Sequence, residues 1–208
     1  MPAKRAFLSL FDMKLLLIVI GFYSLFFSNG DEKRMVAWVI EPSSTLIING
    51  ASNVNQFTCG MSSYQYADTL ELSERTASYI KFSPNKLSLP VVDFDCAHKM
   101  ITSDFQETLQ SDIYPEIGVS FLSLNAASSI VPGVTSYDAV MLIELSGRKR
   151  EVSVHFDFWE KSYSLYNLVG SKTLRFTDFE MVPPSKMMGL VKVADELTID
   201  FNLVIRPL

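Results

Sequence analysis

Several motifs that support common enzymatic reactions are missing from this sequence of 208 residues. Its 9 glycines form no Gly-x-Gly and no Gly-Lys-Ser/Thr pattern, so a phosphate-binding loop is not predicted. A Gly-x-Ser-x-Gly segment, which would place a nucleophilic serine on a sharp turn, is also absent. The sequence therefore favours a protein that is not an enzyme, with no catalytic residue and no cofactor. A hydrolase or cyclase that uses its carboxylates as acid and base is retained as an alternative.

Histidine and cysteine are scarce, with two residues of each type. His98 lies near a predicted helix and His155 on the polar side of a predicted strand, and a solvated or hydrogen-bonded role is expected for both. Cys59 and Cys96 form an even pair, which in an oxidising compartment favours a disulfide over two free thiols. Too few ligands then remain for a metal site with three or four protein ligands, so no metal site is predicted.

Basic residues are also few, since 18 Lys and Arg stand against 23 Asp and Glu, which gives a net charge of −5. Binding to nucleic acid or to an anionic membrane surface needs clustered Lys and Arg, so neither partner is predicted. The one dense basic cluster, Arg148-Lys149-Arg150, follows Gly147 between two strand-like segments. A solvent-exposed hairpin tip is the expected setting for this cluster.

One long apolar run, from Leu15 to Phe27, follows Lys14 and ends at Ser28-Asn29-Gly30. A basic start, an apolar centre and small residues at the end are typical of a secretory signal peptide. As a helix, these 13 residues would reach about 20 Å, short of the roughly 30 Å hydrocarbon core of a membrane. We predict a signal peptide over residues 1–30 and a periplasmic or secreted domain over residues 31–208, without stable membrane insertion after cleavage. An uncleaved membrane anchor is the alternative.

Downstream of residue 35, apolar and polar residues alternate with a period of two. The clearest alternation covers residues 138–145, 151–158 and 196–206. This pattern is typical of antiparallel strands with one buried and one solvated face. Turn-forming residues occur between the strand-like runs at Asn49-Gly50, Ser83-Pro84-Asn85, Val131-Pro132-Gly133, Ser146-Gly147, Val169-Gly170 and Pro183-Pro184. The predicted fold class is all-β, either a sandwich or an up-and-down barrel, in one domain.

One segment departs from this period by repeating apolar residues every four positions, at Ile101, Phe105 and Leu109. Ser103 and Gln106 fit a capping box, and Pro115 would stop a helix. We predict a short amphipathic helix from about 98 to 112 that covers one end of the sheet.

Aromatic and aliphatic side chains dominate the positions that are expected to face inward. These candidates are Phe57, Phe121, Met141, Ile143, Phe156, Phe158, Ile199 and Phe201. In a small barrel such residues either fill the interior or line a cavity for one ligand. A cavity of this composition would suit a lipid tail better than a sugar or a nucleotide. The residues alone leave both alternatives open.

A series of segments between residues 36 and 206 follows a recognisable order and spacing. They are Trp38–Ser44, Gly50–Cys59, Leu89–Cys96, Tyr114-Pro115, Phe176–Phe179, Pro183-Pro184, Met187–Gly189 and Asp195–Leu197. Together they resemble the YceI-like family of exported, lipocalin-like barrels. The family's early histidine is missing here, since Asn53 and Asn55 occupy that segment, and no role of that histidine can be carried over. The Cys59/Cys96 pair fits the subgroup with this Asn-rich opening.

The resemblance implies an eight-stranded antiparallel barrel that, in some relatives, encloses a polyisoprenoid chain. It therefore favours a cavity over a packed interior, with the inward candidates lining it. Asn53, Asn55 and Tyr137 are candidates to hold a polar head group. The predicted function is an exported barrel that carries or sequesters an isoprenoid-type, quinone-like lipid. The alternative is a solidly packed structural or interaction barrel without a ligand.

Overall fold

A computed structural model describes residues 37–61, 64–66, 68–127 and 133–208. The predicted signal peptide, residues 1–30, lies outside the described residues, and so does most of the predicted turn at residues 131–133. In the ranges that are described, no helix is both long enough and apolar enough to cross a membrane.

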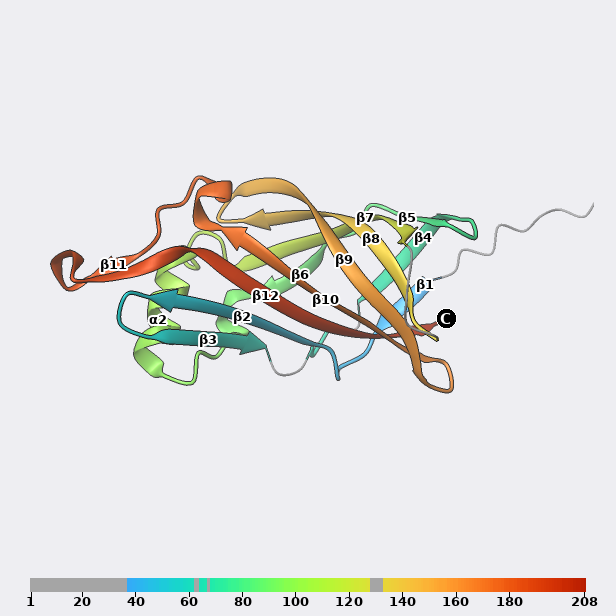
Figure 1. Cartoon of the computed structure of the whole chain (residues 1–208), viewed down its shortest axis with the longest axis horizontal. Helices are drawn as coiled ribbons and strands as arrows, with labels where there is room; N and C mark the ends of the chain where they lie inside the picture. Colours follow the sequence, from blue (N-terminus) through green and yellow to red (C-terminus); the bar gives the residue numbers. More distant parts are fainter. Residues whose placement is uncertain (1–36, 62–63, 67, 128–132) are drawn as a thin grey trace, which may run out of the picture. The chain divides into compact units, whose positions relative to one another are not determined.

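The alternating segments form strands, as predicted (Figure 1). The longer strands are β7 (Glu116–Ala127), β8 (Thr135–Leu145), β9 (Arg148–Ser162), β10 (Leu165–Arg175) and β12 (Val191–Pro207). The shorter strands are β1 (Ala37–Ile40), β2 (Thr45–Ser52), β3 (Gln56–Met61), β4 (Thr69–Arg75), β5 (Tyr79–Phe82), β6 (Leu87–Pro90) and β11 (Ser185–Lys186). In β9, Val154 and Phe156 are buried whereas Ser153 and His155 are exposed, which confirms the period of two.

Within the described residues, eight strands close into an antiparallel ring in the order β1-β4-β5-β7-β8-β9-β10-β12. The ring closes where β1 pairs with the end of β12, with Trp38 opposite Pro207 and Ile40 opposite Ile205. Closure gives each of these strands two neighbours, so none of the eight is an edge strand of the ring. The predicted eight-stranded antiparallel barrel is therefore confirmed.

The 17 residues of β12 give the barrel a second section. The last residues of β12 pair with β1, whereas its segment from Val193 to Asn202 pairs with β2. In turn, β3 pairs with β2, and β6 pairs with the first residues of β7. The section around the first half of β12 is thus walled by β2, β3 and β6 in place of β1, β4 and β5.

The wall of this second section is fastened between β3 and the segment that follows β6. Gly60 and Asp95 form an isolated antiparallel bridge, with backbone hydrogen bonds of 2.9 and 3.0 Å. The neighbouring residues Cys59 and Cys96 form the predicted disulfide, which is confirmed. A covalent bond therefore secures the wall where, among the described residues, strand pairing is reduced to a single bridge.

The predicted helix is confirmed as α2 (Lys99–Thr108). Ile101 and Phe105 pack against the hydrophobic core, and Leu109 is buried just beyond the last turn. Short 3₁₀ helices are η1 (Val91–Asp93), η2 (Phe176–Phe179) and η3 (Met187–Gly189). Figure 1 shows α2 and β11 at the same end of the barrel, and ion pairs between them confirm that they are neighbours.

The termini of α2 differ from the prediction. The capping box of Ser103 and Gln106 is wrong, because His98 is the N-cap and its Nδ1 accepts a hydrogen bond from the Met100 amide at 3.3 Å. The helix also ends earlier than predicted, because Gln110 adopts a left-handed conformation with φ of 55°.

Two of the predicted turns are wrong, because their glycines, Gly50 and Gly170, lie inside β2 and β10. Both glycines make room for an aromatic ring. A Cβ atom on Gly50 would lie 2.3 Å from the ring of Phe57, and one on Gly170 would lie 2.6 Å from the ring of Phe201. The close approach of these rings, and not a bend in the chain, accounts for the two glycines.

The turn at Ser146-Gly147 is confirmed between β8 and β9, with φ angles of 46° and 74° that suit a tight hairpin. The basic cluster follows it at the hairpin end, as predicted. Arg148 and Arg150 both reach the carboxylate of Glu180, at 2.9 and 2.8 Å. These contacts attach the β8–β9 hairpin to the residue that follows η2.

Replacing both Cys59 and Cys96 with Ser should lower the free energy of unfolding by about 4 kcal/mol. The reason is that the disulfide joins residues 37 positions apart and so restricts the conformational entropy of the unfolded chain, which the variant regains. Urea unfolding of the variant and of the unreduced parent measures the difference. Thiol titration of the unfolded, unreduced parent is the control, and two reactive thiols there would contradict the disulfide itself.

Gly170→Ala should destabilise the fold by about 1–3 kcal/mol, as overpacking of a well-filled site does. The added Cβ would lie 2.7 Å from the carbonyl oxygen of His155 and also press on the Phe201 ring. Gly60→Ala is the matched control, because the nearest atom would be 3.5 Å from its Cβ. Equal urea midpoints for the two variants would show that β10 tolerates a side chain at this position.

Candidate functional site

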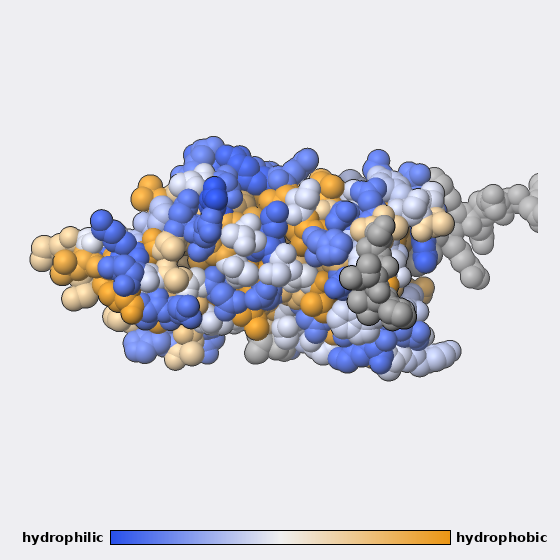
Figure 2. Space-filling model, in the orientation of Figure 1, coloured by the Kyte–Doolittle hydropathy of each residue, from blue (hydrophilic) through white to orange (hydrophobic). Residues whose placement is uncertain are grey.

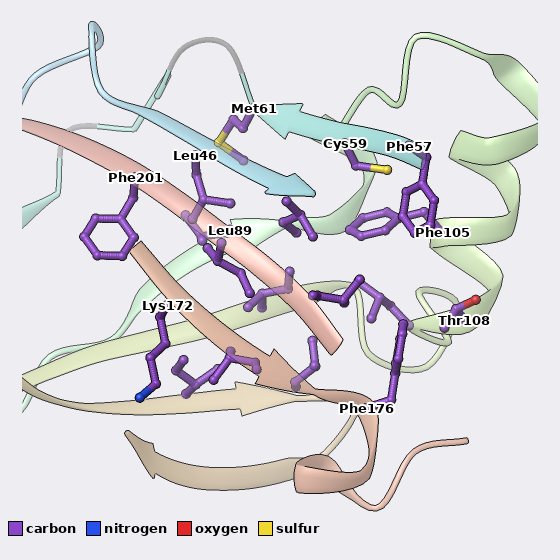
Figure 3. A pocket seen from close by; sticks show the side chains of 18 of the residues that line it. Leu46, Phe57, Cys59, Met61, Leu89, Phe105, Thr108, Lys172, Phe176 and Phe201 are labelled. Carbon is purple, nitrogen blue, oxygen red and sulfur yellow. The ribbon is translucent and has the colours of Figure 1, made fainter. Parts of the chain in front are cut away.

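The second section of the barrel is hollow. A cavity of about 780 Å³ lies inside it, walled by β2, β3, β6 to β10, β12 and α2 (Figure 3). Leu46, Met61 and Leu89 illustrate its lining, in which apolar side chains from several strands face a common space. Such a wall offers mainly carbon atoms to a bound molecule, which suits an apolar ligand.

Aromatic rings form the floor of the cavity. Phe121, Phe156 and Phe201 line it, and the ring centroids of Phe156 and Phe201 are 4.6 Å apart. The ring contacts continue from Phe121 to Phe82 at 5.6 Å, and from Phe82 to Trp38 at 5.9 Å. The section closed by β1 is therefore filled by its own side chains. The alternative of a barrel that is packed solid throughout is contradicted by the cavity.

Most of the predicted inward residues lie along the cavity wall. They are Phe57, Phe121, Met141, Ile143, Phe156, Ile199 and Phe201. Phe158 lies elsewhere, because its ring stacks on Tyr166 at 5.2 Å and lies 6.3 Å from Trp38 in the filled section. The head-group candidate Tyr137 lies there too, packed edge-on against Phe158 at 6.0 Å. The structure does not bring these two residues to the cavity.

The other two head-group candidates lie at the β2–β3 turn, beside the cavity mouth. The Asn53 side chain donates a hydrogen bond to the Leu190 carbonyl at 2.9 Å and accepts one from the Lys192 amide at 2.8 Å. Asn55 lines the mouth, where its Oδ1 accepts a hydrogen bond from the Ser52 hydroxyl at 2.8 Å. Asn53 thus joins the turn to the start of β12, and Asn55 is the candidate nearer to a ligand.

Helix α2 supplies a side of the cavity that the sequence did not assign as lining. Met100, Ile101 and Phe105 face the cavity, and Leu109 continues the same face. The repeat of apolar residues every four positions identified this face, because such residues lie on one side of a helix. The sequence could not show, however, that this face of the helix lines a cavity.

Apolar side chains also surround the mouth on its outer side. Val54, Met100 and Met187 line the mouth and remain 64%, 65% and 70% exposed. Met188 and Leu190, at the end of the β11–β12 hairpin, are exposed as well. Figure 2 shows hydrophobic side chains gathered at the end of the barrel that carries β11. Exposed apolar side chains therefore stand at the mouth of the cavity, beside the charged Lys186 and Asp104.

Charged side chains at the mouth pair with one another. Lys186 of β11 forms ion pairs with Asp104 and Glu107 of α2, at 3.0 and 2.7 Å. The hydrogen bond from Lys186 lowers the pKa of Glu107, and hydrogen bonds to Glu107 and then Asp104 raise the pKa of Lys186. These contacts attach the β11 hairpin to α2 and so hold one side of the mouth in place.

Tyr64 places a buried hydroxyl group in the cavity wall. The hydroxyl donates a hydrogen bond to the carboxylate of Asp68, and the ring packs edge-on against Tyr66 at 5.3 Å. Burial, followed by this hydrogen bond and the negative charge of Asp68, raises the pKa of Tyr64 far above its usual value of 10.0. The phenol is therefore neutral at physiological pH and adds no charge to the wall.

The described ranges contain no group of three or more His, Cys, Asp or Glu side chains that could hold a metal ion. His155 Nδ1 lies 2.8 Å from a carboxylate oxygen of Asp138, and His98 caps α2. Both histidines form hydrogen bonds, which agrees with the solvated or hydrogen-bonded role predicted for them. What the arrangement can do chemically is enclose an apolar molecule and remove it from water.

No model of a known protein family matches the sequence, and no curated protein matches it. Solved structures do match. A polyisoprenoid-binding domain from Saccharophagus degradans, implicated in plant cell wall breakdown, is 11% identical with a TM-score of 0.57, over 81% of this chain and 97% of that one. BcnA from Burkholderia cenocepacia is 16% identical with a TM-score of 0.57, over 78% of this chain and 96% of that one. The Campylobacter jejuni YCEI protein is 8% identical with a TM-score of 0.43, over 60% and 72%.

The first two structures share the barrel fold of this chain along nearly their whole length. At these identities the likeness is one of fold. It supports the barrel fold that the resemblance to the YceI-like family implied.

The free energy of unfolding should fall as the pH rises above about 10, because Tyr64 ionises in the unfolded chain while it stays protonated in the folded one. Tyr64→Phe should remove this part of the alkaline loss, measured by urea unfolding at about pH 8 and about pH 11. The exposed Tyr163, changed to Phe, is the control. An alkaline loss that is the same in Tyr64→Phe and the parent would contradict the assignment.

Proposed function

We propose that this protein, filled at one end of its barrel and hollow at the other, binds an isoprenoid-type lipid and thereby carries or sequesters it. The observation that carries the proposal is the cavity of about 780 Å³ with an apolar wall. Small-molecule sites occupy about 300–1,000 Å³, so the volume suits one such ligand. The domain of similar fold from Saccharophagus degradans is named for binding a polyisoprenoid, which supports this choice of lipid.

The driving force is the removal of a hydrocarbon tail from water. Burial of apolar surface contributes about 25 cal/mol for each Å², and a wall of carbon atoms contacts a tail along its length. A sugar or a nucleotide would instead leave polar groups without partners, at about 1–3 kcal/mol for each unsatisfied group. The wall therefore selects a chain-like apolar molecule over a polar one.

The function involves no bond-making step. The protein would shield a poorly water-soluble hydrocarbon tail, and the exposed rim of Val54, Met100 and Met187 would give that tail an apolar route to the cavity. Action after export, with residues 1–30 as the signal peptide, is part of the proposal. The Cys59–Cys96 disulfide supports it, because disulfides persist in oxidising compartments.

Mass spectrometry of a solvent extract should identify an isoprenoid-type lipid in protein that has been purified without detergent. Protein stripped of lipid should take up a prenylated quinone, detected as co-elution in gel filtration. A protein that yields no lipid and takes up no quinone would contradict the carrier role.

Two cavity-filling substitutions test whether the lipid lies inside the barrel. Ile143→Trp combined with Ile199→Trp should weaken quinone binding by about tenfold or more, because both side chains line the cavity and added volume there competes with the ligand. Ile47→Trp combined with Val92→Trp is the matched control, since these two side chains are exposed. Equal loss of binding in both pairs would place the lipid outside the cavity.

A further inference from the structure

A lysine lies within the apolar wall of the cavity. Lys172 belongs to the inward face of β10, between Gly170 and Leu174. Its neighbour across the sheet is Ile199 of β12, and both side chains line the cavity. Figure 3 shows the Lys172 side chain among the apolar side chains of the wall. A cation in such surroundings calls for a compensating group.

Among the cations of the described residues, Lys172 differs in two respects: no acidic side chain pairs with it, and it is not fully exposed to solvent. The paired cations are Lys86, Arg148, Lys149, Arg150, Arg175, Lys186 and Arg206. The cations that have no acidic partner within those ranges but are exposed to solvent are Arg75, Lys81, Lys99, Lys161 and Lys192. Lys172 alone among the described cations is both unpaired and partly shielded.

Strand β10 separates from β9 beside this lysine. The described ladder between the two strands covers Leu165 to Gly170 and ends with Gly170 opposite Phe156. Beyond that pair, β10 stays paired with β12 as far as Arg175, and β9 stays paired with β8. Lys172 therefore lies two residues past the point where the described β9–β10 hydrogen bonds end. A charged group here can keep contact with water more easily than one at the aromatic floor.

We propose that Lys172 binds an acidic oxygen group of the lipid, a carboxylate or a phosphate. Lys172 is partly shielded and no acidic side chain of the described residues pairs with it, and an anionic oxygen would supply both the opposite charge and hydrogen-bond acceptors. A neutral quinone carbonyl accepts a hydrogen bond but leaves the positive charge uncompensated. The inference rests on the proposed function and narrows its ligand to an acidic isoprenoid-type lipid.

Three probes with the same farnesyl chain separate the head group from the tail: farnesol, farnesoic acid and farnesyl phosphate. Their dissociation constants are measured by titration calorimetry with the full chain after removal of bound lipid. The parent protein should bind at least one acidic probe about tenfold more tightly than farnesol, as a charge-assisted hydrogen bond predicts. Whichever acidic probe is favoured identifies the head group as carboxylate or phosphate.

Lys172→Met should abolish the preference for the acidic probe over farnesol, whereas Lys172→Arg should retain it. Lys161→Met, which removes an exposed lysine of β9, is the matched control and should behave as the parent does. In the parent, the preference should also decrease as salt is added, a measurement that needs no variant.

Equal binding of the three probes by the parent would overturn the inference while leaving the proposed function in place. A preference for the acid that survives in Lys172→Met would overturn it as well, because the charge would then be recognised elsewhere. Binding of none of the probes, farnesol included, would overturn both the inference and the proposed function.

Discussion

The pairing of one long strand with two different partners determines the architecture of this barrel. β12 pairs with β1 near its end and with β2 along its first half. Around the first pairing the ring of strands is continuous. Around the second pairing the wall is interrupted. The described β9–β10 ladder ends beside Lys172, and β3 is joined to the segment after β6 by the single bridge at Gly60. Helix α2 and the disulfide complete the wall there. The cavity thus results from the strand pairing and not from small side chains, because the side chains that line it are large.

This division allows a single domain to contain both a core and a cavity. Ring contacts from Trp38 through Phe82 and Phe121 to Phe156 provide a packed centre that does not depend on any ligand. An empty space lowers stability because its lining loses packing contacts, so a barrel that was hollow throughout would have little to offset that loss. Here the filled section supplies apolar burial, and the covalent bond near the cavity limits the freedom of the unfolded chain.

Much of the fold could be predicted because its signals are local. Alternation identifies a strand and its buried face, since the pleat is a property of the backbone itself. The position of a residue along the barrel axis has no such local signal. Phe156 and Phe158 share a face of β9, yet Phe156 lines the cavity and Phe158 packs in the filled section. Gly50 and Gly170 were mistaken for turn residues because the rings that need their space come from other strands. The sequence places Lys172 at an inward-facing position of β10, where an apolar residue would be expected. Its importance becomes clear only once the cavity is known.

The aromatic floor gives the cavity a fixed depth. Phe121, Phe156 and Phe201 are held by ring contacts that extend into the filled section, so the floor cannot retreat without disturbing the centre of the domain. Under the proposed function, a lipid with more isoprene units than this depth admits leaves its remaining units beyond the rim. Under that proposal, the same phenylalanines that keep the domain folded would set how much of the lipid chain lies inside the barrel.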